Sequence, residues 1–282
     1  MAKAIAVHSY KGGTGKSTIS INLAATLCKN GKNVVLFDMD VYAPSMHMYF
    51  DLKPKKWLND YLFESANIQD TLIDLTDLIK KNNENNEIKI GKLLCGFTNS
   101  SKDEIYKLEG SVRNETSKLQ LLRKFILMKE QILDNVDVDY FILDTSPGIR
   151  YWSINSLAIS DIIFLVLKMT DLDISGTKLL IDEIYKNFES LGTKSYVLLN
   201  RAQGYCQPPG QINNFNNDNH SEKKELNSDD TEKTMQKEMN MKVISKLPCY
   251  CDIQFDKREF LTVVKYPDHP FSNDLLVLSK KI

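Results

Sequence analysis

The sequence predicts an α/β fold with a doubly wound, mostly parallel sheet and helices on both faces. Short apolar segments recur along the 282-residue chain, with segments of helical periodicity between them. The apolar segments are nearly continuous, which is typical of parallel strands that are buried on both faces. Regular alternation of the two kinds of segment favours the doubly wound class over separate layers of helices and strands.

Each expected element follows from its apolar spacing. We expect strands at residues 4–7, 34–37, 140–143, 162–167, 195–199 and 243–247. Helices are expected over 17–29, 112–136 and 174–188, and Gly31 stands where a left-handed cap would end the first helix. The buried stripe of the second helix is predicted to consist of Leu119, Leu122, Phe125, Ile126 and Ile132.

Composition and length indicate one domain, residues 1–282. Apolar residues make up 42% of the chain, which is enough for a sizeable core and excludes a wholly disordered protein. A polar, Asn-rich stretch over 204–240 is predicted to be a mobile insertion, and residues 80–87 a surface loop. The formal net charge of −1 gives no support for DNA or an anionic membrane as a partner.

Cysteine usage and hydropathy indicate a cytoplasmic protein. Five cysteines are too few and odd in number for a disulfide framework, so a reducing compartment is expected. The longest apolar run, residues 162–167, is far shorter than the roughly 20 residues of a membrane-spanning helix.

A glycine-rich phosphate loop lies between the first expected strand and helix. Such a loop turns backbone N–H groups onto an anion, in front of a helix N-terminus, and adds a lysine for the phosphates and a hydroxyl for magnesium. The standard pattern lacks its first glycine, because Tyr10 stands there, and a dinucleotide-binding GxGxxG lacks its third, at Thr18. The predicted phosphate-binding residues are Lys11, Gly12, Gly13, Thr14, Gly15, Lys16, Ser17 and Thr18.

The segment KGGTGKST resembles the deviant Walker A motif of the MinD/ParA/Mrp group of P-loop ATPases, in which a signature lysine precedes the glycines. The resemblance extends over most of the chain outside 204–240 and implies a P-loop NTPase fold, ATP or ADP as ligand, and magnesium as cofactor. It also implies slow hydrolysis to ADP and phosphate in an ATP-dependent homodimer. Lys16 is then expected to hold the phosphates, and Lys11 to contact the nucleotide of the partner subunit.

Two carboxylate segments follow expected strands. Asp38 and Asp40 are two positions apart, so their side chains point the same way in an extended chain. Asp144 ends the apolar run that begins at Tyr140. By resemblance to the family, Asp40 should position or deprotonate the attacking water with Asp38 in support. Ser17 and Asp144 should organise magnesium.

A late strand ends in Leu-Asn-Arg, residues 199–201. An amide offers one acceptor and two donors, which matches the edge of adenine. In the family, an Asn-Lys or Asn-Arg pair at this position resembles the adenine-recognition element. We therefore expect Asn200 and Arg201 to contribute to ATP binding, although an asparagine after a strand is also a common turn residue.

The biological role stays open at this stage. The first reading is a switch that positions an unidentified protein partner or cargo. Cys249 and Cys251 form a C-x-C pair that could bind a metal or iron–sulfur cluster, although Mrp-type carriers typically use CxxC. A third reading is a ParA-like DNA partitioning ATPase. The C-terminal segment with its two terminal lysines could contact a membrane, but it is more typical of an ordinary last helix.

Overall fold

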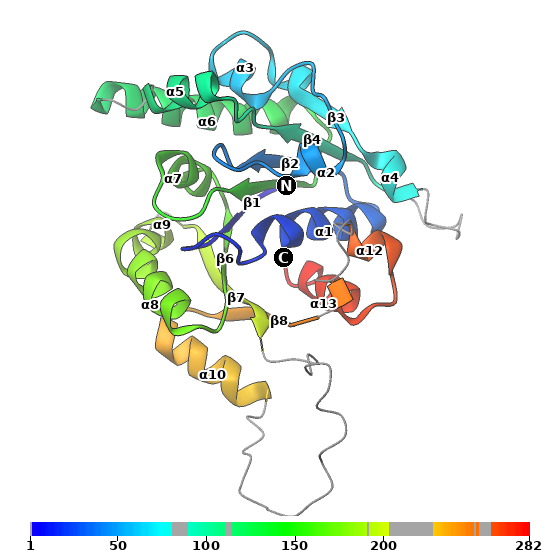
Figure 1. Cartoon of the computed structure of the whole chain (residues 1–282), viewed down its shortest axis with the longest axis vertical. Coiled ribbons are helices and arrows are strands. Elements are labelled where there is room, and N and C mark those ends of the chain that lie inside the picture. Colours follow the sequence, from blue (N-terminus) through cyan, green and yellow to red (C-terminus); the bar gives the residue numbers. More distant parts are fainter. Residues whose placement is uncertain are drawn as a thin grey trace, which may run out of the picture.

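The computed structural model describes residues 2–80, 90–110, 114–190, 192–202, 228–250, 252–253 and 261–282. Its sheet has the strand order β3-β4-β2-β5-β1-β6-β7-β8 (Figure 1). The strands are β1 Lys3–His8, β2 Val34–Met39, β3 Leu72–Asp74, β4 Leu93–Phe97, β5 Tyr140–Thr145, β6 Ile162–Leu167, β7 Lys194–Ala202 and β8 Val243–Pro248.

Seven of these strands run parallel, and only β3 is antiparallel to its neighbour β4. All six expected strands are present, whereas β3 and β4 were not predicted. The sequence places β1 first, but it lies near the middle of the sheet between β5 and β6. The loop that follows β1 therefore opens at a point where the strand order reverses, where open α/β sheets bind their ligands.

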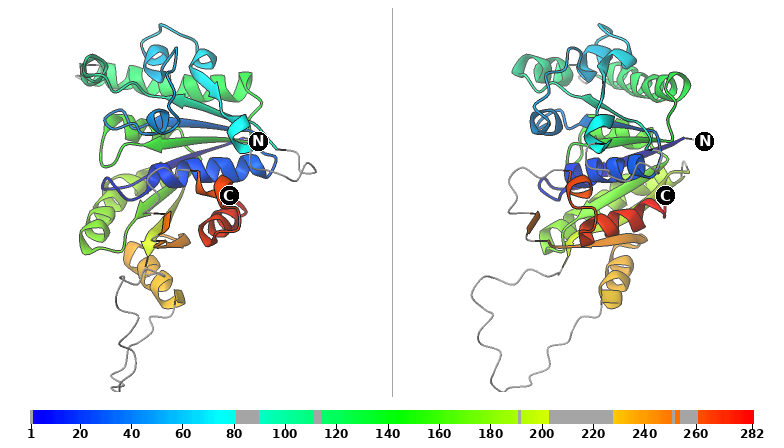
Figure 2. Two further views of the ribbon diagram at one scale, coloured as in Figure 1. Left: turned by 45° about the vertical axis from the view of Figure 1, so that its right-hand side comes forward. Right: turned by 90° about the vertical axis from the view of Figure 1, so that its right-hand side faces the viewer.

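Helices cover both faces of the sheet, as Figure 2 shows. Alternate residues of β1 enter two separate cores: Ile5 packs with α1 and α13, and Ala6 with α6 and α7. The helices are α1 Lys16–Lys29, α2 Met46–Tyr49, α3 Leu58–Leu62, α4 Thr76–Lys80, α5 Lys102–Gly110, α6 Glu115–Asn135, α7 Tyr151–Ala158, α8 Asp171–Leu180, α9 Lys186–Ser190, α10 Ser228–Met239, α12 Thr262–Lys265 and α13 Pro270–Ser279, with a 3-10 turn η1 Ile68–Thr71 and a π-helical turn η2 Ile181–Tyr185.

The helix α6 corrects part of the predicted stripe. Its buried residues are Leu121, Phe125, Met128 and Ile132. Leu119 and Ile126, which were expected inside, are 66% and 44% exposed. The four buried residues are spaced by four, three and four positions, which keeps them on the one side of α6 that faces the sheet. The predicted set also included residues from the adjacent, exposed side of the helix.

The third expected helix, over 174–188, contains a π-helical turn. It begins as α8, continues through η2 and ends as α9. A π turn shifts the helix face by about one residue. Here it follows Leu180, which is fully buried, and ends at Tyr185, which is also fully buried.

Part of the range expected as a mobile insertion is helical. Its last part forms α10, whose Met235 and Met239 are buried in the core. Residues 203–227 and the expected loop at 81–89 lie outside the described residues. The helix α13 has Pro270 in its first turn and buries Phe271, Leu275 and Leu278, so its apolar side is already covered by the core. None of the described helices has the length and apolarity needed to cross a bilayer.

Candidate functional site

The phosphate loop follows β1 and leads directly into α1. Gly13 and Gly15 have φ angles of +73° and +96°, a backbone conformation that glycine adopts without strain. The Ser9 hydroxyl donates to the carbonyl oxygen of Lys11 at 2.6 Å and accepts from the Lys16 ammonium at 3.0 Å. This arrangement bends the chain around the N-terminus of α1, which has the electrostatics of an anion site.

Lys16 is a buried cation, with 6% of its surface exposed. Burial lowers the pKa of its ammonium, and the carboxylates of Asp144 and Asp40 oppose that shift. The side chain therefore lies between the phosphate loop and the acidic strand ends. A phosphate bound in the loop would add the anionic partner that a desolvated ammonium favours.

Asp38 and Asp144 lie side by side because β2 and β5 are paired in register at these two residues. Burial is the main cause that raises the pKa of Asp144 to about 6, and the nearby Ser17 hydroxyl and Lys16 counter it. The Ser20 hydroxyl donates to Oδ1 of Asp144 at 3.1 Å. Oδ2 is buried with no hydrogen-bond partner among the described residues. An unsatisfied carboxylate oxygen beside Ser17 fits the oxygen chemistry of Mg²⁺.

The two aspartates of the segment formed by residues 38–45 have different environments. Asp38 is 1% exposed and accepts from the backbone N–H groups of Asp40 at 3.3 Å, and of Ser45 and Met46 at 3.1 Å each. Burial, together with Asp144, raises the pKa of Asp38 to about 8. Asp40 instead faces the pocket, and its Oδ1 accepts from the Ser146 hydroxyl at 2.8 Å. Asp38 thus shapes the segment, whereas Asp40 is available to ligands.

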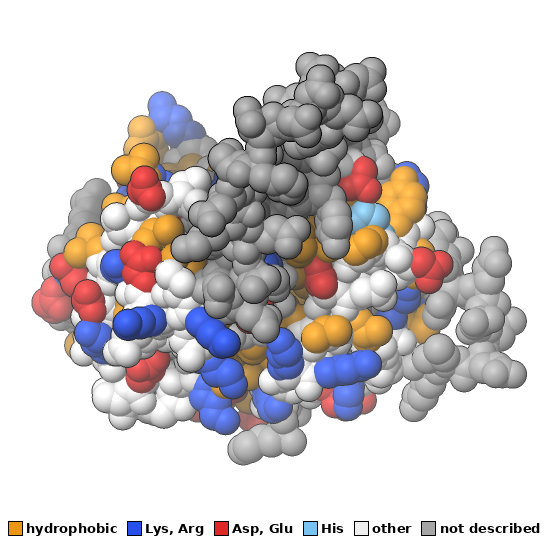
Figure 3. Space-filling model, turned by 90° about the horizontal axis from the view of Figure 1, so that it is seen from below, with side chains coloured by type: hydrophobic (Ala, Val, Ile, Leu, Met, Phe, Trp, Pro, Cys, Tyr) orange, Lys and Arg blue, Asp and Glu red, His pale blue; other side chains and the backbone are white. Residues whose placement is uncertain are grey.

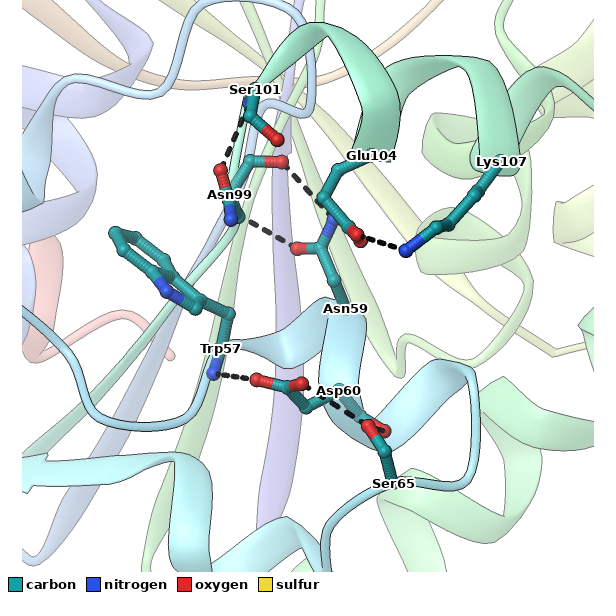
Figure 4. Close-up of polar contacts among 8 residues, drawn as sticks. All are labelled: Trp57, Asn59, Asp60, Ser65, Asn99, Ser101, Glu104 and Lys107. Carbon is teal, nitrogen blue, oxygen red and sulfur yellow. Dashed lines mark hydrogen bonds and ion pairs between the residues drawn. The ribbon is translucent and has the colours of Figure 1, made fainter.

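A set of polar contacts holds the strand end behind Asp38. The Thr98 hydroxyl donates to the carbonyl oxygen of Asp38 at 2.6 Å. The next residue, Asn99, is joined to Asn59 of α3 by two hydrogen bonds, at 2.7 Å and 3.0 Å (Figure 4). These contacts fix the end of β4 and, with it, the position of Asp38. They come from residues that belong to none of the motifs found in the sequence.

His8 ends β1 directly before the loop and is 1% exposed. Its Nδ1 lies 2.6 Å from the Thr145 hydroxyl, which donates to the carbonyl oxygen of Val7 at 3.0 Å. Burial and the nearby Lys16 lower the pKa of His8 to about 3. The imidazole is therefore neutral at physiological pH.

The phosphate end of the site is a cavity of about 480 Å³ at the carboxyl ends of the strands. Most of the sequence-predicted phosphate-binding residues meet there, whereas Lys11 and Thr14 do not line the cavity. Its lining consists of Gly12, Gly13, Gly15, Lys16, Ser17, Thr18, Asp40, Tyr42, Ala43, Ser45, Ser146, Pro147, Arg150 and Arg201.

A second cavity of about 220 Å³ shares Gly15, Thr18 and Arg201 with the first. It adds an aromatic and apolar wall from the end of the chain, made by Pro248, Tyr250, Ile253 and Phe271. Its size and position suit a nucleotide base next to the phosphate end.

Asn200 lies between the two ends of the site. It lines the second cavity, and its side-chain amide donates to the carbonyl oxygen of Thr14 at 2.7 Å. A side chain on Gly15 would overlap this amide. The structure thus shows Asn200 supporting the phosphate loop, a contact that the spacing could not indicate. Its contact with a base stays a prediction.

Three neighbours of the phosphate loop were not singled out from the sequence. The Tyr10 ring packs against α8 at Gly176, where any added Cβ would overlap it. The Lys168 ammonium lies 3.9 Å from the position that a Cβ on Gly13 would take. Arg150 lines the phosphate cavity. The signal that could have indicated Lys168 and Arg150 is their place just after strands that flank β1.

The cysteine pair is only partly described. Cys249 follows β8, and its backbone N–H donates to the carbonyl oxygen of Ala202 at 2.9 Å. Cys251 lies outside the described residues. Within the described part of the chain, no group of three or more His, Cys, Asp or Glu side chains is arranged to hold a metal ion.

Comparison with known proteins adds family information to this geometry. Residues 2–195 match a protein family described as the AAA domain. An uncharacterised protein of Methanocaldococcus jannaschii is 30% identical over 186 residues, 66% of each chain. A flagellum site-determining protein of Helicobacter pylori is 32% identical over 58% of this chain and 47% of its own length. An iron–sulfur cluster carrier protein of Aquifex aeolicus is 52% identical, but over 18% of this chain and 14% of its own.

These matches span at most about two thirds of the length of the curated relatives. Among solved structures, the septum site-determining protein MinD of Pyrococcus horikoshii in complex with Mg-ADP has a TM-score of 0.70. The likeness covers 100% of this chain and 96% of that one, at 16% identity. It confirms the predicted fold class.

Proposed function

Because this chain belongs to the family described as the AAA domain, we propose that it is a Mg-ATP-dependent ATPase switch of the MinD/ParA type. The family match and the fold together confirm the resemblance to MinD/ParA ATPases that the phosphate loop predicted. In the proposal, the switch hydrolyses ATP slowly as a homodimer and positions a partner protein or cargo. The observation that carries it is the single cavity that brings the phosphate loop, Asp40 and Ser146 together.

In the proposal, different residues bind the phosphates, the base and the magnesium ion. The loop N–H groups and Lys16 would bind the phosphates, and the cavity beside Asn200 would take the base. Ser17 and Asp144 would hold Mg²⁺, which when bound neutralises charge between the β- and γ-phosphates. The unsatisfied Oδ2 of Asp144 supports that assignment.

Asp40 is the proposed residue that orients water and accepts its proton. It faces the cavity, and the Ser146 hydroxyl holds its Oδ1 at 2.8 Å. Asp38 is a poor candidate, because both of its oxygens accept backbone N–H groups and its pKa is raised to about 8. The backbone N–H groups of Tyr42 and Ala43 also donate to Asp40, but only to its Oδ1. Asp38 would therefore act by positioning the segment that carries Asp40.

Lys11 is proposed to act across the dimer. Its side chain does not line the cavity of its own subunit, and it forms no ion pair with another described residue. Tyr42 and Ile149, on the loops that follow β2 and β5, are 37% and 47% exposed. Apolar surface of this kind beside a nucleotide pocket suits contact with a second copy of the chain. A cation supplied by that copy would offset charge developing on the phosphates.

The test is light scattering after size exclusion. Samples are the wild type without nucleotide and with ADP, and the Asp40→Ala variant with ATP, which should be a dimer only in the last case. Lys16→Ala should lose nucleotide binding by at least about 100-fold, because buried charge-assisted contacts to phosphate disappear. Lys11→Ala should bind ATP and remain a monomer. The matched control is the exposed Lys53→Ala, and wild-type hydrolysis by Lys11→Ala would contradict the intersubunit role.

The iron–sulfur carrier is the second candidate, supported by the C-x-C pair and the short match to a carrier protein. Anaerobically purified protein from the same column should then absorb near 400 nm and be a dimer regardless of nucleotide. Substituting Cys249 and Cys251 by serine should leave a pure switch active and abolish the absorbance of a carrier.

The DNA-partitioning reading has weaker support. Figure 3 shows Lys and Arg side chains gathered on the face seen from below, with acidic side chains among them. Lys233, Lys237 and Lys242 line a hollow of about 400 Å³ beside α10. Binding to nonspecific DNA that weakens steeply between 50 and 200 mM salt would favour this reading over the other two.

A further inference from the structure

We propose that Arg150 contacts the γ-phosphate of the ATP bound to its own subunit and that Tyr42 positions its guanidinium. This inference rests on the proposed function. Arg150 comes from the loop after β5, next to Ser146 and Pro147, and lines the cavity together with Asp40 and the glycines of the phosphate loop. It adds a cation to a site in which Lys16 and Arg201 are the expected ones.

The two arginines of the site occupy different ends. Arg201 lines both cavities and therefore lies towards the base. Arg150 lines only the first, beside Asp40 and Ser146. Because Asp40 and Ser146 extend from the strand ends β2 and β5, away from the base cavity, Arg150 is on the side of the terminal phosphate.

The local helix structure does not favour an arginine at position 150. It occupies the N-cap of α7, where its side chain forms no capping hydrogen bond, and the first turn of that helix has no acidic residue. N-caps favour Ser, Thr, Asp or Asn. A cation at a helix N-terminus opposes the dipole by about 0.3–1 kcal/mol. Departures of this kind from local preference concentrate at functional sites.

The guanidinium of Arg150 is held in position, but its charge is not neutralised. Its central carbon lies 4.9 Å from the centre of the Tyr42 ring. Tyr42 lies in the segment formed by residues 38–45, and its N–H donates to Oδ1 of Asp40 at 3.3 Å. No carboxylate of the described residues forms an ion pair with Arg150. An aromatic face orients a guanidinium and leaves its N–H fork available for phosphate oxygens.

The loop that carries Arg150 is anchored to the phosphate loop. Gly148 has a φ of +74°, and its N–H donates to the carbonyl oxygen of Ser9 at 2.9 Å. The N–H of Arg150 donates to the carbonyl oxygen of Gly148 at 3.1 Å. The arginine is thus two residues from a direct contact with the loop that would bind the phosphates. A cation fixed at this place can offset charge that develops on the terminal phosphate.

The test compares Arg150→Gln with the wild type in binding to a non-hydrolysable ATP analogue and to ADP. The measurement is calorimetry at a protein concentration at which the wild type is monomeric. We expect the affinity for the analogue to fall by at least about 10-fold and that for ADP to change by less than about 2-fold, because only ATP has the γ-phosphate. The turnover number should fall by at least 10-fold as well.

Three further variants sharpen the result. Arg123→Gln removes an exposed arginine of α6 and should match the wild type. Tyr42→Ala should reproduce part of the loss in analogue affinity without affecting ADP, and Tyr42→Phe, which keeps the ring, should restore the analogue affinity that Tyr42→Ala loses. Removing a cation from the N-terminus of α7 should not lower the melting temperature, so a folded Arg150→Gln is expected.

The outcomes are distinct. If the wild type binds neither nucleotide, the proposed function fails. If the wild type binds both and Arg150→Gln loses analogue and ADP affinity equally, or loses neither, the contact between Arg150 and the γ-phosphate is wrong. If Tyr42→Ala matches the wild type, Tyr42 does not position the arginine.

Discussion

The two ends of the nucleotide site differ in how the chain builds them. The phosphate end is made by short continuous segments, each following a strand, and contains buried charges: Lys16 and Asp144 are 6% and 0% exposed. The second cavity, which is the proposed base end, is made by single residues of segments distant in sequence, such as Asn200, Tyr250 and Phe271. It is lined mainly by apolar and aromatic groups.

The difference shows which interactions depend on backbone geometry. At the phosphate end, glycine conformations and the N-terminus of α1 determine the site, so changes there should affect all ligands with phosphates. At the base end, individual side chains determine the site. Changes there should therefore affect selectivity between bases more than the overall affinity for nucleotides. Three substitutions test this contrast, from the largest expected effect to the smallest.

The largest effect is expected for Gly176→Ala, which disturbs the phosphate end from α8. The new methyl group would overlap the Tyr10 ring. Overpacking of this kind costs about 1–3 kcal/mol, which exceeds the gain of about 0.5–1 kcal/mol from replacing a helical glycine. We expect a lower free energy of unfolding and at least about a 10-fold loss of affinity for both ATP and ADP, measured by denaturant unfolding and calorimetry.

A double variant and a control separate the effect of steric overlap with the Tyr10 ring from the general effect of replacing a helical glycine by alanine. Tyr10→Ala combined with Gly176→Ala should recover most of the lost stability, because the ring is gone. Gly110→Ala in α5 meets no atom within 4 Å and should not be destabilising. Equal losses in the single and double variants would show that the Tyr10 ring is not the cause.

The second test uses pH and the raised pKa of Asp38. The folded-state pKa of about 8 lies above the ordinary value of 3.8, so the folded protein binds a proton that the unfolded chain has released. Stability from this group is therefore present below pH 4 and is lost as pH rises towards 8. Asp144, with a pKa raised to about 6, is half titrated at pH 6 and completes its similar change by about pH 7. His8, with a pKa lowered to about 3, acts in the opposite direction below about 6.5.

Between pH 6.5 and 8, Asp38 should thus dominate among these three groups. In magnesium-free buffer, we expect the free energy of unfolding of the wild type to fall across this window by about 1–2 kcal/mol. Asp38→Asn should show little such fall, because its side chain does not ionise. Asp134→Asn, at an exposed position of α6, should behave as the wild type. If the free energy of unfolding of Asp38→Asn falls with pH as in the wild type, a different titrating group causes the fall.

The smallest effect is expected at the base end. Asn200→Ala removes the hydrogen bond to the carbonyl oxygen of Thr14 at 2.7 Å. A net contribution of about 0.5–1.5 kcal/mol predicts roughly a 3- to 10-fold loss of ATP affinity. Competition binding should also show a lower preference for ATP over GTP. Asn135→Ala, which removes an exposed amide-to-carbonyl bond at 3.0 Å, should change neither quantity. An unchanged ratio of ATP to GTP affinity in Asn200→Ala would contradict a contact with the base.

The sequence by itself determined the fold class and the parts of the site that follow local rules. Glycines at 13 and 15, Lys16 at the start of α1 and Asp144 at the end of β5 all lie where backbone geometry and strand order predict them. Apolar runs of four to six residues also indicated the central strands. These signals are readable because they depend on neighbours in the chain.

Only the tertiary structure decided which side chains support or complete that site. It showed that Asn200 holds the phosphate loop, that Tyr10 packs at Gly176 and that Arg150 faces the cavity from an N-cap. It also assigned the buried side of α6 and the order of part of the expected insertion. Each of these depends on contact between segments far apart in the sequence. Spacing along one segment contains no information about such contacts, because packing in three dimensions selects them.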